Sequence, residues 1–150
     1  MTHLPDSLEI IWSCVLAAIA AQVIKCLIFL IIKKPVTFRT LVQTGGMPSS
    51  HSALVACLAT GVGLIDGFSS TTFAIASGFA AVVMYDAAGL RQAAGRMAGI
   101  LNKMTEDLYK HRSDYVPARL RELLGHTPYE VIAGALLGAL TAILVHHASL

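Results

Sequence analysis

The sequence predicts an all-α integral membrane protein, a polytopic bundle of about four membrane-spanning helices with short amphipathic helices beside them. Of the 150 residues, 55% are hydrophobic and 13% are charged, whereas a soluble domain carries about 25% charged residues. The apolar residues also gather in long runs instead of recurring at amphipathic spacing. A chain of this length forms a single domain, residues 1–150, and so small a domain cannot bury that many apolar runs away from water. A water-soluble fold is therefore excluded.

The first two predicted helices enclose a polar loop. The first covers about residues 8–32, which is long enough to cross a bilayer with some tilt. A pair of lysines before Pro35 ends it, and the polar loop over 36–48 contains a Gly-Gly pair as its flexible point. The second helix covers about 50–65 and is closed by Asp66. Its length is marginal for a span, so it is expected to sit partly within the fold.

The second half of the chain alternates between apolar and mixed segments. A third helix is predicted over 71–84. Over 88–104, apolar residues recur at helical spacing with cations between them, which indicates an amphipathic helix lying either at the membrane interface or on the bundle. A short helix is expected over 119–124 and a last membrane helix over 128–147. Thr127 can cap this last helix, because Pro follows it and a Glu three residues later completes a capping box.

The distribution of charge predicts the orientation of the bundle. With four spans, the loops 33–49 and 87–127 fall on one side, and both are rich in Lys and Arg. The positive-inside rule then places these loops in the cytoplasm and both termini outside. The N-terminal segment carries Asp6 and Glu9 and lacks the basic start of a signal peptide, so the first apolar run is expected to be retained. The compact chain without a targeting segment favours a bacterial inner membrane.

Composition also limits the partners and cofactors. The net charge is +2, and aromatic residues do not alternate with basic ones, so a nucleic-acid partner is excluded. The Gly-x-x-x-Gly segments 95–99 and 134–138 let helices approach closely, which permits a homodimer. The cysteines lie within apolar runs without metal-ligand spacing, so no cofactor is predicted and reduced thiols are expected at Cys14, Cys26 and Cys57.

Two histidines mark two predicted helix starts. His51 follows a Met-Pro-Ser-Ser string at the mouth of the second helix, and His126 comes directly before the capping box of the last helix. The N–H groups at a helix start form an anion site, and a His titrating near neutral pH serves as nucleophile or general acid. The pair therefore indicates phosphate chemistry at a membrane surface. Glu130 is explained equally well as the capping-box acid and as a group that orients His126.

Several cations and hydroxyls fall where they can hold a phosphate. Lys25 lies inside the first apolar run, where it either snorkels to the interface or presents a cation from within the bundle. Arginines near the helix ends can grip a phosphate bidentately, and serines at the second helix start can cap it or bind phosphate oxygens. Asp86 forms a boundary ion pair or supports the site. The predicted phosphate-binding residues are Lys25, Arg39, Ser49, Ser50, Arg91 and Arg121.

Three motifs of the chain resemble one family. The segments 44–53 (TGGMPSSHSA), 85–91 (YDAAGLR) and 124–131 (LGHTPYEV) are together similar to the divergent branch of the type 2 phosphatidic acid phosphatases, which is related to acid phosphatases and vanadium-dependent haloperoxidases. By this resemblance, His126 is the nucleophile that forms a phosphohistidine and Glu130 orients it. His51 then protonates the leaving alkoxide, and no metal is required.

The chain departs from the better-known phosphatases at several positions. Ser50 replaces the Gly of their Pro-Ser-Gly-His motif, and Glu130 replaces an Asp. The Ser-Arg half of their third motif is missing at its usual spacing from His126, so Arg121 or Arg91 would substitute for it. In the first motif, Arg39 is followed by Thr rather than Pro, and Lys25 competes with the two lysines at 33–34 for the Lys role.

The function predicted from these residues is hydrolysis of a lipid-linked phosphate or pyrophosphate at the membrane face, with membrane lipids as the surroundings and a lipid phosphate as the substrate. One alternative is a protein that binds or translocates a lipid phosphate without chemistry. A second is a Zn or Mn site built from His51, Asp86, His126 and Glu130. A purely structural membrane subunit is the third, and it leaves the Gly-Gly-Met-Pro-Ser-Ser-His loop unexplained.

Overall fold

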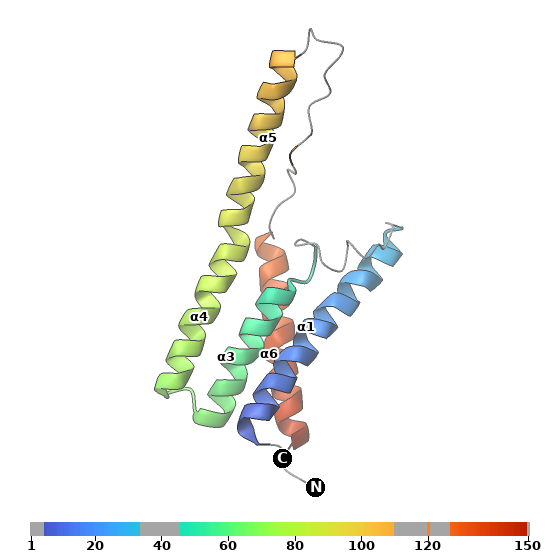
Figure 1. The fold of residues 1–150 in the computed structure, drawn as a ribbon. Coiled ribbons are helices and arrows are strands. Elements are labelled where there is room, and N and C mark those ends of the chain that lie inside the picture. The colour runs from blue at the N-terminus through green and yellow to red at the C-terminus, as the bar shows by residue number, and fades with distance from the viewer. Residues whose placement is uncertain (1–4, 34–45, 110–119, 121–126, 150) are drawn as a thin grey trace.

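The computed structural model describes residues 5–33, 46–109, 120 and 127–149, and all regular secondary structure within this part is helical. The predicted all-α fold is confirmed, with helix bounds close to those expected (Figure 1). The amphipathic helix is longer than predicted, since it runs to Tyr109, and the short helix expected over 119–124 lies outside the described residues apart from Leu120. The helices are α1 (Asp6–Ile31), α3 (Ser50–Asp66), α4 (Thr71–Ala88), α5 (Leu90–Tyr109) and α6 (Pro128–Ser149).

Four of these helices form a membrane bundle. α1, α4 and α6 are long and apolar enough to cross a membrane, and α3 is a shorter apolar helix of 17 residues, or about 25 Å at 1.5 Å per residue. α3 nevertheless occupies the centre, because it packs against α1, α4 and α6. Both termini lie at one end of the bundle, and the C-terminus of α1 and the N-termini of α3 and α6 lie at the other, called here the site end (Figure 1).

Small side chains fill the centre of the bundle, and large ones face outward. The core consists of alanines and buried thiols, namely Cys14, Ala17, Ala21, Ala53, Cys57 and Ala142. In contrast, Ile19 of α1, Phe79 of α4 and Leu136 of α6 are each more than half exposed. Lipid tails are as apolar as these side chains, so membrane helices associate through close contact of small residues. The distribution is that of a bundle surrounded by lipid.

α6 approaches α3 closely through the glycines of the predicted Gly-x-x-x-Gly segment. A Cβ added at Gly134 would collide with the carbonyl oxygen of Ser49, and one at Gly138 with that of Ala53. Only glycine leaves room for the backbones to meet at this separation. The segment 134–138 therefore packs against α3 of the same chain and is not available to a second copy. The homodimer stays a prediction, and it would need another surface.

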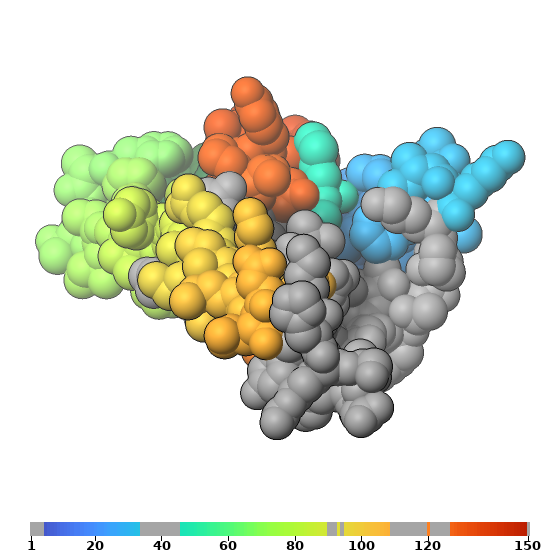
Figure 2. Space-filling model, turned by 90° about the horizontal axis from the view of Figure 1, so that it is seen from above, coloured from blue at the N-terminus to red at the C-terminus, as the bar shows by residue number. Residues whose placement is uncertain are grey.

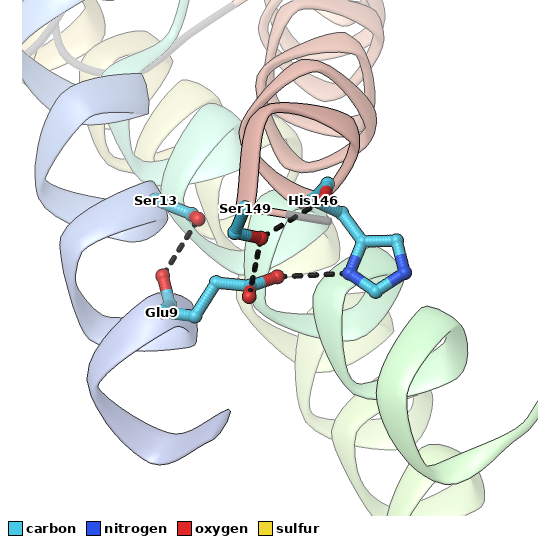
Figure 3. A network of polar contacts seen from close by, with 4 residues as sticks. All are labelled: Glu9, Ser13, His146 and Ser149. Atoms are coloured by element: carbon cyan, nitrogen blue, oxygen red, sulfur yellow. Dashed lines mark hydrogen bonds and ion pairs between the residues drawn. The ribbon is translucent and has the colours of Figure 1, made fainter. Parts of the chain in front are cut away.

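A polar cluster ties α1 to α6 at the end of the bundle that carries the termini (Figure 3). The carboxylate of Glu9 is buried and lies 2.9 Å from Nδ1 of His146, and it accepts a 2.6 Å hydrogen bond from the hydroxyl of Ser149. The hydroxyl of Ser13 donates to the backbone carbonyl of Glu9 over 2.7 Å. We call Glu9, His146 and Ser149 the terminal clamp, because they join the first turn of α1 to the last turn of α6.

α5 does not pack on the bundle. Among the described helices it contacts α4 alone, and it continues α4 beyond the site end (Figure 1). At the junction, the N–H of Gly89 donates to Tyr85 and the N–H of Ala93 donates to Gly89, so the backbone ladder is carried across from one helix to the next. The sequence allowed this amphipathic helix to lie either at the membrane interface or packed on the bundle. The structure does not show it packed on the bundle.

The close contact of α3 and α6 predicts the effect of adding one methyl group. We expect Gly138→Ala to destabilise the fold by about 1–3 kcal/mol, because α6 must move away from the Ala53 carbonyl. Gly78→Ala in α4 is the matched control, since nothing lies within 4 Å of its added Cβ and Ala is a better helix former by about 1 kcal/mol. Thermal unfolding in detergent, followed by circular dichroism, measures both variants. Equal tolerance of the two substitutions would contradict the packing described.

The terminal clamp predicts different effects of two neighbouring carboxylates. Glu9 and Asp6 both lie in the first turn of α1, so each loses a similar interaction with the helix dipole, about 0.3–1 kcal/mol, when changed to Ala. Glu9→Ala also removes the partner of His146 and Ser149, and we expect a further loss of about 1–3 kcal/mol. The measurement is the same unfolding transition, and indistinguishable Glu9→Ala and Asp6→Ala proteins would show that the clamp contributes nothing to stability.

Candidate functional site

The N-termini of α3 and α6 are joined directly at the site end. The backbone N–H of Ser49, the residue before α3, donates to the carbonyl of Glu130 in the first turn of α6 over 3.0 Å. Ser49 is completely buried, and its Oγ accepts from the N–H of Ser52 at 3.3 Å and from the hydroxyl of Ser52 at 3.0 Å. Ser49 is therefore the N-cap of α3, as predicted, and its side chain is enclosed between the two helices.

The capping box predicted for the last helix is confirmed. The N–H of Thr127 donates to Oε2 of Glu130 over 3.0 Å, and the N–H of Glu130 donates to the hydroxyl of Thr127 over 3.4 Å. This reciprocal pair fixes the Glu130 side chain at the start of α6. Glu130, which is partly buried, follows His126 by four residues in the sequence.

Lys25 is buried within the bundle, with only 2% of its surface exposed. It lies on the inner side of α1, one turn beyond the core residue Ala21. Gly46 covers its aliphatic stem, because a Cβ built at Gly46 would lie 3.5 Å from Cδ of Lys25 and 3.5 Å from the ring of Phe29. Glu130 lies close enough for its carboxylate to attract the Lys25 ammonium group. The sequence allowed Lys25 either to extend to the membrane interface or to lie within the bundle. In the structure its side chain lies within the bundle.

The loop before α3 takes its shape from Gly46. This residue has φ of +90°, a conformation that favours glycine, and the Met47–Pro48 peptide that follows is cis. The sequence identified this Gly-Gly pair only as a flexible point, whereas Gly46 packs against Lys25. Ser52 was also missed, although it follows the His of the same motif and is fully buried against Ser49.

The other predicted residues occupy several positions around this group. His51 is exposed in the first turn of α3, Ser50 beside it is partly buried, and Asp86 is partly buried near the end of α4. Arg91 lies in the first turn of α5, and the description does not extend to its side chain. Arg39, Arg121 and His126 lie outside the described residues. The structure thus brings together Lys25, Ser49 and Glu130 and places His51 and Asp86 on their helices.

The geometry of this end suits an oxyanion. Two helix N-termini meet there, each with a partial positive charge, and several of their N–H groups already donate to the caps. Lys25 adds a cationic group in a buried position, where water screens it weakly, and Glu130 offsets part of its charge. Within the described ranges, no three His, Cys, Asp or Glu side chains come together as ligands for a metal ion. The described part of the site therefore offers the positive ends of two helices, a Lys and a Glu.

Comparison with known proteins identifies a family of membrane proteins that this chain matches over most of its length. The family model described as "Divergent PAP2 family" matches residues 7–141 of this chain. The chain is 41% identical over 139 residues to the uncharacterized membrane protein YuiD of Bacillus subtilis (strain 168), an alignment that covers 86% of this chain and 88% of that protein. No solved structure matches.

The buried position of Ser49 predicts that it contributes more to stability than a simple helix cap. Ser70 caps α4 in the same way, accepting from the N–H of Phe73 at 3.1 Å, at the opposite end of the bundle. We expect Ser70→Ala to cost about 1 kcal/mol. Ser49→Ala should cost about 1–3 kcal/mol more, because the buried Ser52 hydroxyl loses its acceptor. Denaturation midpoints of the two variants test this, and equal losses would reduce Ser49 to an ordinary cap.

Proposed function

Because the chain belongs to the divergent PAP2 family over residues 7–141, we propose that it is a membrane-embedded phosphatase that hydrolyses a lipid-linked phosphate or pyrophosphate. The observation that carries the proposal is Lys25, a cation held inside the bundle beside the joined N-termini of α3 and α6. Burying an ionisable group at membrane depth is costly, so such groups mark substrate sites rather than simple packing. A phosphate is the anion that this combination of Lys and helix N-termini suits best.

The proposed reaction runs through two displacements at phosphorus. His126 attacks the phosphorus in line, so a P–N bond forms as the P–O bond to the lipid breaks, and His51 gives its proton to the departing alkoxide. Water, deprotonated by His51, then cleaves the phosphohistidine and releases inorganic phosphate. Lys25 and the N–H groups at the start of α3 hold the phosphoryl oxygens in both steps.

Glu130 has two tasks in this scheme. Its Oε2 holds the N–H of Thr127 and so fixes the first turn of α6. The same carboxylate accepts a hydrogen bond from Nδ1–H of His126, which leaves Nε2 as the nucleophile and stabilises the positive charge that the ring gains when it is phosphorylated. The Glu that stands here in place of the Asp of the better-known phosphatases is consistent with a side chain that must also complete a capping box.

A groove on α1 supports a lipid rather than a soluble substrate. It has a volume of about 400 Å³, within the range of small-molecule sites. It runs along the same half of α1 as Lys25, so a hydrocarbon chain lying in it can stay in lipid while its phosphate reaches the site. The groove is lined by Ala18, Ile19, Gln22, Val23, Cys26 and Leu27.

We further propose that the site faces the cytoplasm of a bacterial inner membrane. The support is the charge of the loops 33–49 and 87–127, which are both basic and join the helices at the site end (Figure 1). Positive loops remain on the cytoplasmic side.

Phosphate release by the detergent-purified protein tests the function. The substrates are phosphatidic acid, phosphatidylglycerophosphate and polyprenyl phosphates and pyrophosphates, each with and without chelator. We expect release that is indifferent to chelator and abolished in His126→Ala and in His51→Ala. Release that disappears with chelator would favour the metal-dependent alternative. Binding of a lipid phosphate without any release would overturn the enzyme proposal in favour of binding or translocation.

Two lysine variants test the phosphate cradle. Lys25→Met removes the charge and keeps the aliphatic stem under Gly46, and we expect kcat/KM to fall by about 100-fold or more, as for the loss of a donor to a transition-state oxyanion. Lys33→Met is the control, because Lys33 is exposed just after the end of α1, and it should stay close to wild type. If the Lys33 variant lost activity and the Lys25 variant kept it, the site would be wrongly placed.

A further inference from the structure

α5 has the reverse of the polarity expected of a helix in water. Its large apolar side chains are 51–79% exposed, whereas Gly95, Ala98 and Asn102 are buried. At 100° per residue the two sets lie on roughly opposite sides of the helix. In the view from above (Figure 2), α5 lies to one side of the ends of α3 and α6. The exposed set, called here the α5 stripe, consists of Met97, Ile100, Leu101, Met104 and Leu108.

Asn102 fixes which side of α5 faces the protein. Its amide nitrogen donates to the carbonyl of Leu120 and its amide oxygen accepts from the N–H of Leu120, both over 2.8 Å. These two hydrogen bonds engage both ends of the amide group across 18 residues of sequence. The α5 stripe is therefore turned outward by specific bonds on the opposite side of the helix.

The α5 stripe continues the lipid-facing side of α4. Ile75, Phe79 and Val82 are 68%, 54% and 68% exposed on that membrane helix. Met97 and Ile100 follow Phe79 and Val82 by 18 residues, which is five turns of an α-helix. Because the backbone ladder crosses Gly89, these residues lie on the same side. One apolar side thus runs from the membrane helix into α5.

The length of this continuous helix sets where the α5 stripe must lie. Residues 71–109 extend over about 58 Å at 1.5 Å per residue, whereas the hydrocarbon core of a bilayer is about 30 Å thick. If α5 stood upright on α4, its stripe would be in water. In Figure 1 α5 continues α4, so the stripe reaches the boundary between headgroups and acyl chains only when α5 inclines at Gly89, the residue between the two helices.

The charges beside the α5 stripe favour anionic lipid over a second copy. Arg96 and Lys103 lie seven residues apart on one edge of the stripe and are exposed, with Asp107 on the same edge. Ala98 and Thr105 lie toward the other edge, and no acidic residue described in α5 lies on that side. A second copy related by a two-fold axis along the membrane normal would present the same edge, so four cations would face two carboxylates. Phospholipid phosphates supply only the opposite charge.

We propose that the α5 stripe is a lipid-binding surface, immersed in the leaflet at the site end, with Arg96 and Lys103 in contact with the phosphates of anionic lipids. An amphipathic helix of this kind binds through its buried apolar area and through attraction to anionic headgroups. Each cation adds about 1 kcal/mol, or about fivefold in the equilibrium constant for immersion of α5. The proposal rests on α5 alone and does not depend on phosphatase activity.

Tryptophan depth measurements on the full-length protein test this surface. In a Trp12→Phe background, which removes the single native Trp, a Trp is introduced in Ile100→Trp or Met97→Trp on the stripe, or in Glu106→Trp on the far side as control. Each protein is reconstituted in vesicles of phosphatidylcholine and phosphatidylglycerol with brominated acyl chains. We expect blue-shifted emission and several-fold stronger quenching for the two stripe positions than for the control.

A second series tests the role of charge. Arg96→Gln and Lys103→Gln, in the Ile100→Trp protein, should each lower the equilibrium constant for immersion of α5 about fivefold in phosphatidylglycerol vesicles, seen as weaker quenching, and have little effect in pure phosphatidylcholine. Asp107→Asn is the control and should not lower it. Equal, weak quenching at the stripe and control positions would overturn the proposal. Blue-shifted but unquenched stripe positions, with cross-linking of Ile100→Cys between copies, would also overturn it and assign the stripe to a dimer.

Discussion

The close contact between α3 and α6 is the constraint on which the rest of this structure depends. The carbonyl oxygens of Ser49 and Ala53 occupy the space that side chains would take at Gly134 and Gly138, so the two backbones meet with nothing between them. Within lipid no hydrophobic effect drives helices together, and close dispersion contact and hydrogen bonds must do so instead. The same approach lets the Ser49 N–H reach the Glu130 carbonyl. The pairing of the two helix N-termini at the site end is thus a consequence of two glycines.

The bundle has a core of small apolar residues between two polar layers. At one end the terminal clamp of Glu9, His146 and Ser149 joins α1 to α6. At the other end Lys25 of α1 is buried beneath Gly46, and the backbone N–H of Ser49 joins the start of α3 to Glu130 of α6. The terminal clamp therefore fixes α1 against α6 at one height, and the backbone contact fixes α3 against α6 at the other.

α5 differs from the bundle helices in the arrangement of its exposed apolar side chains. The bundle helices are apolar nearly all round and need lipid on every outer side, whereas α5 has a narrow apolar stripe and polar flanks. Asn102 attaches the opposite side of α5 to the chain at Leu120. α5 thus carries an exposed apolar surface on one side and is joined on the other, through Asn102, to the chain at Leu120.

The helices, their caps and most candidate site residues could be predicted from the amino-acid sequence. Apolar runs and capping residues are local signals, which is why the bounds of the membrane helices, the Ser49 cap and the Thr127–Glu130 box agree with the structure. The inward position of Lys25, the cover that Gly46 gives it and the contact of Glu9 with His146 across 137 residues became visible in the folded bundle alone. A membrane helix that is apolar all round carries no stripe to show which side faces its neighbours, so its rotation and its long-range partners follow from packing alone.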